Sequence, residues 1–181
     1  MRSIIFLISL VCCLASAPVN SIAQNSPSTS GAEQNNPLPF SVPKDLTELP
    51  EFALVVTTKG PFEIKLFREL APTSVANFRH LGLAGFYEGI AFHRFVPNFV
   101  IQGGDPIGNG KGGPGWRLLP EISSSVTHVV GTVGWARKKA ERNPQRLSSG
   151  SQFYICLSPQ PRLDGFYSAF GVVVKGMENV K

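Results

Sequence analysis

Short apolar runs separated by glycine and proline limit most strongly what this chain can fold into. One stretch, residues 72–81, instead repeats Val75, Phe78 and Leu81 at a spacing of three, as one face of a helix does. The other runs are four to eight residues long, which is typical of strands. Together they predict a mostly-β barrel with one helix in this part of the chain. The expected strands span residues 52–58, 62–67, 91–96, 99–102, 129–136, 153–157 and 170–174.

The first 23 residues have the pattern of an export signal. Arg2 precedes an apolar run at 4–14, and small residues suited to cleavage follow at 15–17 and 21–23. The run is shorter than the about 20 residues that a bilayer-spanning helix needs, so removal of the signal is favoured over an uncleaved anchor. We therefore expect an exported protein, periplasmic or secreted, with no stable membrane span after signal cleavage.

The remaining sequence divides into a polar linker and one domain. Residues 24–50 are polar and rich in proline, and they are predicted to be a disordered linker. The domain is expected to span residues 51–181. Cys156 is the one cysteine left after signal cleavage, so an intramolecular disulfide is not available. Its apolar neighbours favour a buried, inert thiol.

Most of the net charge of +5 comes from one basic segment. The favoured interpretation is a solvated loop, and the alternative is a segment that attracts acidic client proteins or an anionic membrane surface. Nucleic acid is not expected as a partner, because no recognised nucleic-acid module is visible. The glycine-rich stretch at 103–115 lacks the Lys-Ser/Thr pair of a nucleotide-binding loop. The basic residues are Arg137, Lys138, Lys139, Arg142 and Arg146, with Glu141 among them.

Alternation along three of the expected strands places polar and aromatic side chains on one outer face. Successive side chains point to opposite faces, so Gln152 and Tyr154 share the face opposite to Phe153. Apolar residues beside one arginine and amides, with no paired acid and base, suit a reaction that breaks no covalent bond. Rotation about an X–Pro peptide bond is such a reaction. If the strands meet, the patch contains Arg94, Gln102, Gln152 and Tyr154.

Five motifs occur in order along the expected domain. They are Phe-His-Arg at 92–94, Pro-Asn-Phe at 97–99, Gln-Gly-Gly-Asp at 102–105, Gly-Ser-Gln-Phe at 150–153 and Leu-Asp-Gly at 163–165. Through them the chain resembles the cyclophilins, which are peptidyl-prolyl cis–trans isomerases. The resemblance implies a mostly-β fold, a closed eight-stranded antiparallel barrel with capping helices. It also implies an outer groove for proline-containing segments of client proteins, with no metal or other cofactor.

The resemblance further implies a set of site residues. Arg94 corresponds to the catalytic arginine of the family and Gln102 to the glutamine that orders it. Arg162 replaces a tryptophan of members that bind cyclosporin tightly, so weak cyclosporin binding is expected. The implied substrate-binding positions are Phe99, Val100, Ala136, Arg137, Gln152, Tyr154, Leu163 and Tyr167. Of these, Val100, Tyr154 and Tyr167 depart from the commonest residues of the family.

The resemblance places a second helix and a last, barrel-closing strand beyond the final residues of this sequence. We therefore expect a C-terminally truncated barrel. A fragment of a longer product is favoured over a complete chain of reduced stability, because an unpaired strand edge is a liability.

The favoured function is a monomeric isomerase that accelerates X–Pro rotation during the folding of exported proteins. The alternative is a non-catalytic module that binds proline-containing or acidic peptide segments. A hydrolase that uses Ser151 or Cys156 is disfavoured, because neither residue lies in a recognisable nucleophile motif.

Overall fold

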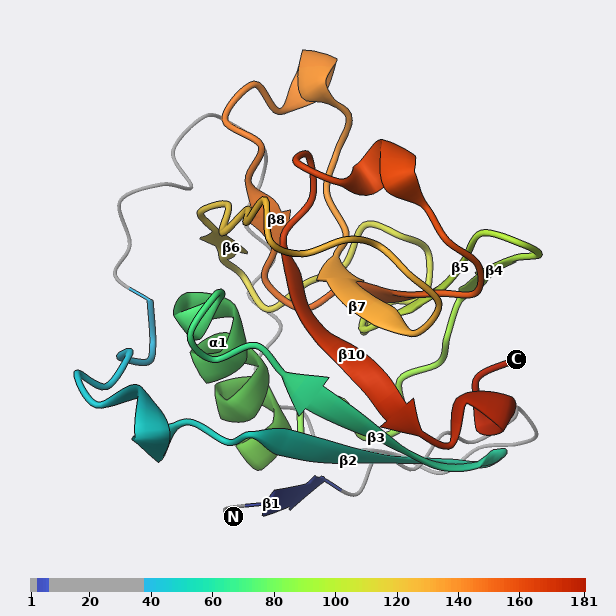
Figure 1. Ribbon diagram of the computed structural model, residues 1–181, viewed down its shortest axis with the longest axis horizontal. Helices are drawn as coiled ribbons and strands as arrows, with labels where there is room; N and C mark the ends of the chain where they lie inside the picture. Colours follow the sequence, from blue (N-terminus) through green and yellow to red (C-terminus); the bar gives the residue numbers. More distant parts are fainter. Residues whose placement is uncertain (1–2, 7–37) are drawn as a thin grey trace.

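A curled sheet forms the body of the protein in the computed structural model, which describes residues 3–6 and 38–181 (Figure 1). The strand order in the sheet is β1-β2-β3-β10-β7-β9-β5-β4. Neighbours from β2 to β4 pair antiparallel, whereas β1 pairs parallel with β2. The strands are β1 (Ser3–Phe6), β2 (Phe52–Thr57), β3 (Gly60–Leu66), β4 (Arg94–Val96), β5 (Val100–Gly103), β7 (Thr132–Trp135), β9 (Phe153–Cys156) and β10 (Ala169–Lys175).

Shorter elements complete the fold. A separate two-stranded sheet joins β6 (Arg117–Leu118) to β8 (Ser148–Ser149). The α-helix α1 (Pro72–Leu83) begins with proline, whose fixed φ suits a first helical turn. The 3-10 turns within residues 38–181 are η1 (Leu46–Glu48), η2 (Ala140–Arg142), η3 (Pro161–Leu163) and η4 (Met177–Asn179).

The predicted fold class is confirmed, with differences in detail. The protein is mostly β, with a barrel-like curved sheet and, in the described residues, one α-helix. The strand order is open, however, because β1 and β4 are its two ends and do not pair with each other. The expected strand at 91–96 begins only at Arg94, and the expected strand at 129–136 is confined to β7. The two-residue strands β6 and β8 were not predicted, because so short a run has no periodicity.

Aromatic side chains of α1 and the sheet meet in the core. Phe78 of α1 lies with its ring centroid 5.3 Å from that of Phe170 and 5.8 Å from that of Phe153. Trp135 stacks on Phe170 at a centroid distance of 4.3 Å. All four side chains are buried, so the inner face of the sheet is occupied by packing and its outer face is left for a site.

Residues 38–50 pack against the core, although they were assigned to the linker. Leu49 is buried, and Leu38, Phe40, Val42 and Leu46 are partly buried against the core. The disordered linker predicted for residues 24–50 therefore does not extend over residues 38–50. The physical reason is that apolar residues recur through this proline-rich stretch and bury enough surface to order it. Residues 24–37, and residues 7–23 of the predicted signal, lie outside the described residues.

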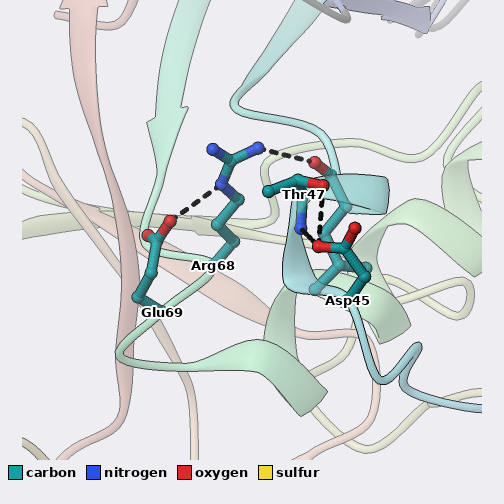
Figure 2. Close-up of polar contacts among 5 residues, drawn as sticks. Asp45, Thr47, Arg68 and Glu69 are labelled. Atoms are coloured by element: carbon teal, nitrogen blue, oxygen red, sulfur yellow. Dashed lines mark hydrogen bonds and ion pairs between the residues drawn. The ribbon is translucent and has the colours of Figure 1, made fainter.

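Polar contacts hold this packed segment in place (Figure 2). The Arg68 guanidinium donates to the Leu49 carbonyl oxygen at 3.3 Å and to the Glu69 carboxylate at 2.9 Å. The Asp45 carboxylate caps η1 by accepting from the Thr47 backbone N–H at 2.9 Å and from its hydroxyl at 2.7 Å. No helix in the described part of the chain is both long enough and apolar enough to cross a bilayer.

Candidate active site

Four neighbouring strands bring three predicted site residues and a glycine into one row. Arg94 of β4 lies opposite Gln102 of β5, which lies opposite Tyr154 of β9, which in turn lies opposite Gly134 of β7. Residues directly opposite each other in antiparallel strands point to the same face. The three strands that sequence alternation could not place together therefore do meet, and the predicted outer patch exists.

A chain of hydrogen bonds positions Arg94. Its Nη1 donates to Gln102 Oε1 at 3.3 Å, and Gln102 Nε2 donates to Gln152 Oε1 at 3.0 Å. Gln152 Nε2 then donates to the backbone carbonyl of Gly112 at 2.7 Å. Gln152 is buried whereas Arg94 is exposed. An exposed guanidinium is thus connected, through two amides, to a fixed point of the backbone.

The loop that supplies this fixed point is itself organised by Asp105. The carboxylate is buried and accepts hydrogen bonds from the backbone N–H groups of Ile107 and Gly110. Burial by itself would raise the pKa of Asp105, but backbone N–H groups of the loop outweigh burial and lower that pKa. Asp105 therefore acts as a turn-forming anion, and the glycine-rich loop presents the Gly112 carbonyl to Gln152.

An apolar cluster lies beside the guanidinium. Arg94 Cζ is 5.7 Å from the centroid of the Phe99 ring. This cluster, referred to below as the pocket, consists of buried Val100, Tyr154, Cys156 and Leu163, with partly buried Phe99 and Tyr167 packed against it. The sequence predicted all of these residues as site residues except Cys156.

Cys156 is a wall of the pocket and not a nucleophile. It lies opposite Val100 in the β5–β9 pairing, two residues after Tyr154 and therefore on the same face. Burial raises the pKa of its thiol to about 12, so the thiol is neutral near pH 7. The prediction of a buried, inert thiol is confirmed. The period of two along β9 was the signal that could have placed it in the pocket.

The Tyr154 hydroxyl continues into a buried polar network that the sequence did not predict. It lies 3.0 Å from Nε2 of His128, and Nδ1 of the same ring lies 2.7 Å from the Asp164 carboxylate. The His128 backbone N–H also donates to that carboxylate at 2.8 Å. An ionised carboxylate only accepts hydrogen bonds, so Nδ1 donates, and Nε2 of a neutral ring accepts from the tyrosine. The Leu-Asp-Gly motif contains Asp164, but no local pattern points to His128.

Two pKa shifts agree with this network. Burial raises the pKa of Tyr154 well above its usual value, so the hydroxyl keeps its proton and can donate. The hydrogen bond from His128 is the main cause of a lowered pKa at Asp164, which keeps that carboxylate ionised.

Gly134 makes room for the tyrosine. A Cβ at this position would lie 2.5 Å from Tyr154 Oη and 2.7 Å from its Cζ. A side chain larger than hydrogen would therefore displace the Tyr154 ring. The pairing of Gly134 with Tyr154 arises only from the β7–β9 register, so sequence inspection did not identify it.

Ala136 and Arg137 extend the groove beyond β7. The Ala136 N–H donates to the Gln152 carbonyl at 2.9 Å, which fixes this backbone next to the glutamine. Arg137 Nε donates to the Phe166 carbonyl at 3.1 Å, and its Cζ lies 4.4 Å from the Tyr167 ring centroid. The sequence-predicted site residues are thus linked to one another by strand pairing, hydrogen bonds, apolar packing and ring contacts.

His93 directly precedes Arg94 and contributes no polar contact to the site. Its ring nitrogens are buried, but neither has a hydrogen-bond partner among the described residues. Within residues 38–181, no three His, Cys, Asp or Glu side chains group together as a metal site would need.

Comparison with known proteins identifies what this arrangement is similar to. Residues 52–181 match the family described as cyclophilin type peptidyl-prolyl cis-trans isomerase/CLD. The chain is 45% identical over 119 residues to a peptidyl-prolyl cis-trans isomerase of Synechococcus elongatus, covering 66% of this chain and 77% of that protein. It is 42% identical over 120 residues to peptidyl-prolyl cis-trans isomerase B of Bacillus subtilis, covering 66% and 80%.

Solved structures give the same result. A cyclophilin type peptidyl-prolyl cis-trans isomerase of Cryptosporidium parvum superposes with a TM-score of 0.66 at 34% identity, covering 71% of this chain and 80% of that one. A second structure of that protein, in the presence of the dipeptide Ala-Pro, superposes with a TM-score of 0.64.

Proposed function

The chain belongs to the cyclophilin-type peptidyl-prolyl cis–trans isomerases, and we propose that Arg94 is the group with which it accelerates X–Pro rotation. The observation that carries this assignment is the position of the guanidinium. It lies at the edge of an apolar pocket and is held from behind by Gln102. The relative determined in the presence of Ala-Pro supports a proline-containing ligand. The non-catalytic alternative is not favoured, because the relatives are named isomerases.

The mechanism follows from the electronic structure of the peptide bond. Its rotation barrier is about 18–20 kcal/mol, because the nitrogen lone pair is delocalised into the carbonyl. A guanidinium that donates to the prolyl nitrogen localises this lone pair and makes the nitrogen pyramidal. The interaction is stronger in the twisted transition state than in either planar ground state, which is the condition for catalysis. Arginine suits this role because it stays charged at any working pH.

The apolar residues of the pocket and the side-chain amides of Gln102 and Gln152 would assist catalysis by holding the substrate and Arg94 in position. Phe99, Val100 and Leu163 offer apolar surface to a pyrrolidine ring, while Tyr154 forms the buried floor. Low-dielectric surroundings strengthen the hydrogen bond from Arg94. Gln102 and Gln152 keep the guanidinium oriented, so little reorganisation is needed during the reaction.

Arg94→Ala tests the assignment. We expect kcat/KM for X–Pro isomerisation to fall about 10²–10³-fold, the usual effect of removing one transition-state donor. Line-shape or exchange NMR on a proline peptide measures both directions of rotation. Arg79→Ala is the matched control, because Arg79 is an exposed arginine of α1. Equal rates for Arg94→Ala and the parent chain, with an unchanged circular dichroism spectrum, would remove Arg94 from the mechanism.

We also propose that the clients are exported proteins and that the protein acts in the periplasm or outside the cell. The support is the export-signal pattern of residues 1–23. Strand β1 lies within that segment, so cleavage would leave the antiparallel strands β2 to β4 as the sheet. N-terminal sequencing of the fractionated protein checks this. We expect a new terminus after residue 17 or 23, and an intact Met1 in a cytosolic fraction would contradict export.

A further inference from the structure

Three guanidinium groups border the pocket, and two of them are not part of the catalytic hydrogen-bond chain. Arg162 Cζ lies 4.4 Å from the Phe99 ring centroid, and Arg137 Cζ lies 4.4 Å from the Tyr167 ring centroid. Arg94 Cζ lies 5.7 Å from the same centroid. Each aromatic wall at the edge of the pocket therefore carries a stacked cation. Stacking restricts these side chains, so less entropy is lost when they bind an anion.

These cations lack acidic partners. Arg137 donates to the carbonyl oxygens of Phe166 and Lys138, and Arg94 donates to an amide. None of the three arginines forms an ion pair with a carboxylate of the described residues. Between residues 137 and 167 the sequence has six Lys or Arg and two acids, Glu141 and Asp164. The Asp164 carboxylate is already used by His128.

The basic loop is an extension of this rim. Arg146 Cζ lies 5.3 Å from the ring centroid of Phe166, and the Phe166 carbonyl accepts from Arg137. The loop that contains η2 is thereby held against the segment that follows η3, and Figure 1 shows both turns on the same upper side of the sheet. Lys138, Lys139 and Arg142 are exposed on the loop. We call this surface the cationic rim: Arg137, Lys138, Lys139, Arg142, Arg146 and Arg162.

We propose that the cationic rim makes this protein selective for X–Pro segments with Asp or Glu close to the proline. The inference rests on the proposed function, because two cations of the rim, Arg137 and Arg162, lie against the aromatic residues beside which the proline would bind. Charge complementarity raises the association rate and disfavours basic segments. Exposed pairs are individually weak, so the selectivity comes from several cations acting together.

An acidic peptide fits this rim better than an anionic membrane does. Arg137 and Arg162 stack on the rings of Tyr167 and Phe99 and therefore lie against the apolar cluster of the site. A peptide seated in the pocket brings its neighbouring residues within reach of both arginines. A bilayer surface would meet the exposed lysines of the loop first and leave the pocket cations without partners.

The test compares three peptides that contain the same X–Pro pair. The residues that flank this pair are Glu in the first peptide, Gln in the second and Lys in the third. We expect kcat/KM measured by exchange NMR at low salt to decrease in that order, with about three- to tenfold between Glu and Gln. At about 0.5 M NaCl the ratio of kcat/KM for the Glu peptide to that for the Gln peptide should approach one, because exposed charges are screened.

The loop variant Lys138→Gln/Lys139→Gln/Arg142→Gln/Arg146→Gln should lower this Glu/Gln ratio. The rate with the Gln peptide should stay within about twofold of the parent rate, since only exposed pairs with acidic peptides are lost.

Further variants separate the parts of the proposal. Arg162→Glu should lower the Glu/Gln ratio further or invert it, and Arg79→Gln should leave the ratio unchanged. Equal rates with the Glu and Gln peptides at low salt would overturn the selectivity and leave the isomerase assignment intact. Inactivity with all three peptides would instead contradict the proposed function. Fluorescence anisotropy would then measure the affinity for each peptide, and equal affinity for the Glu and Gln peptides would overturn the proposed selectivity. If the protein binds phosphatidylglycerol vesicles in a salt-sensitive way and shows no peptide selectivity, the cationic rim binds an anionic membrane surface and the proposed peptide selectivity is overturned.

Discussion

The floor and the rim of the groove lie next to each other but depend on different physical forces. The floor is Tyr154 with His128 behind it, both buried and joined by a hydrogen bond. The rim is formed by exposed or half-exposed cations such as Arg137 and Arg162. Leaving a buried polar group without a partner costs about 1–3 kcal/mol, whereas an exposed charge pair contributes about 0–1 kcal/mol. Changes in the floor should therefore alter folding, and changes in the rim should alter only ligand choice.

Gly134→Ala is expected to have the largest effect on stability. The added Cβ would meet Tyr154 Oη at 2.5 Å, and the ring cannot retreat without disturbing the His128 contact. Overpacking of this kind costs about 1–3 kcal/mol. Urea denaturation measures the free energy of unfolding. Gly113→Ala is the matched control, because a Cβ there meets nothing within 4 Å and the residue has ordinary φ. Equal stability of the two variants would show that the floor is not tightly packed.

Tyr154→Phe should have the next largest effect. It removes the hydroxyl and leaves His128 Nε2 buried without a partner, which should cost about 1–2 kcal/mol. Tyr167→Phe is the comparison, because the Tyr167 hydroxyl makes no hydrogen bond within the described residues; that change should be nearly neutral. If Tyr154→Phe is as stable as the parent chain, the polar network behind the pocket does not stabilise the floor.

The sequence predicted the parts of the site that lie on single strands, and it missed the parts that depend on register. Alternation placed Gln152 and Tyr154 on one face, and the motifs selected Arg94. The contact between Gly134 and Tyr154 requires the β7–β9 pairing, and the contact between His128 and Tyr154 spans 26 residues. No local pattern encodes either contact. The ordering of residues 38–50 was missed for a similar reason, because its apolar residues pack against a core that is distant in the sequence, as Phe40 does against His80 of α1.

Protonation of Asp164 at low pH should lower the free energy of unfolding. Its pKa is lowered in the folded state, mainly by the hydrogen bond from His128. A carboxyl group whose pKa is lower in the folded than in the unfolded state stabilises the fold above its unfolded pKa of about 3.9. This contribution is lost as pH falls through the lowered folded pKa. Thermal unfolding between pH 6 and pH 2.5 should therefore show a smaller acid loss for Asp164→Asn than for the parent chain. Asp105 has a pKa lowered in the same direction, so some acid loss should remain. Identical pH profiles would mean that the network does not depend on the ionised carboxylate.

Substitutions of Arg162 should have the smallest effect on stability and a clear effect on ligands. The side chain is exposed and stacks on Phe99 from outside, so Arg162→Ala should change the free energy of unfolding by less than about 0.5 kcal/mol. We expect weak cyclosporin binding by the parent chain, and Arg162→Trp should strengthen it, because an indole adds apolar surface and an N–H donor at the groove. Titration calorimetry measures the affinity, with Arg162→Ala as the control for simple loss of charge. If Arg162→Ala strengthens binding as much as Arg162→Trp does, repulsion by the cation is the cause and not the missing indole. A loss of more than about 1 kcal/mol in Arg162→Ala would break the distinction between floor and rim, because surface substitutions usually stay within about 0.5 kcal/mol.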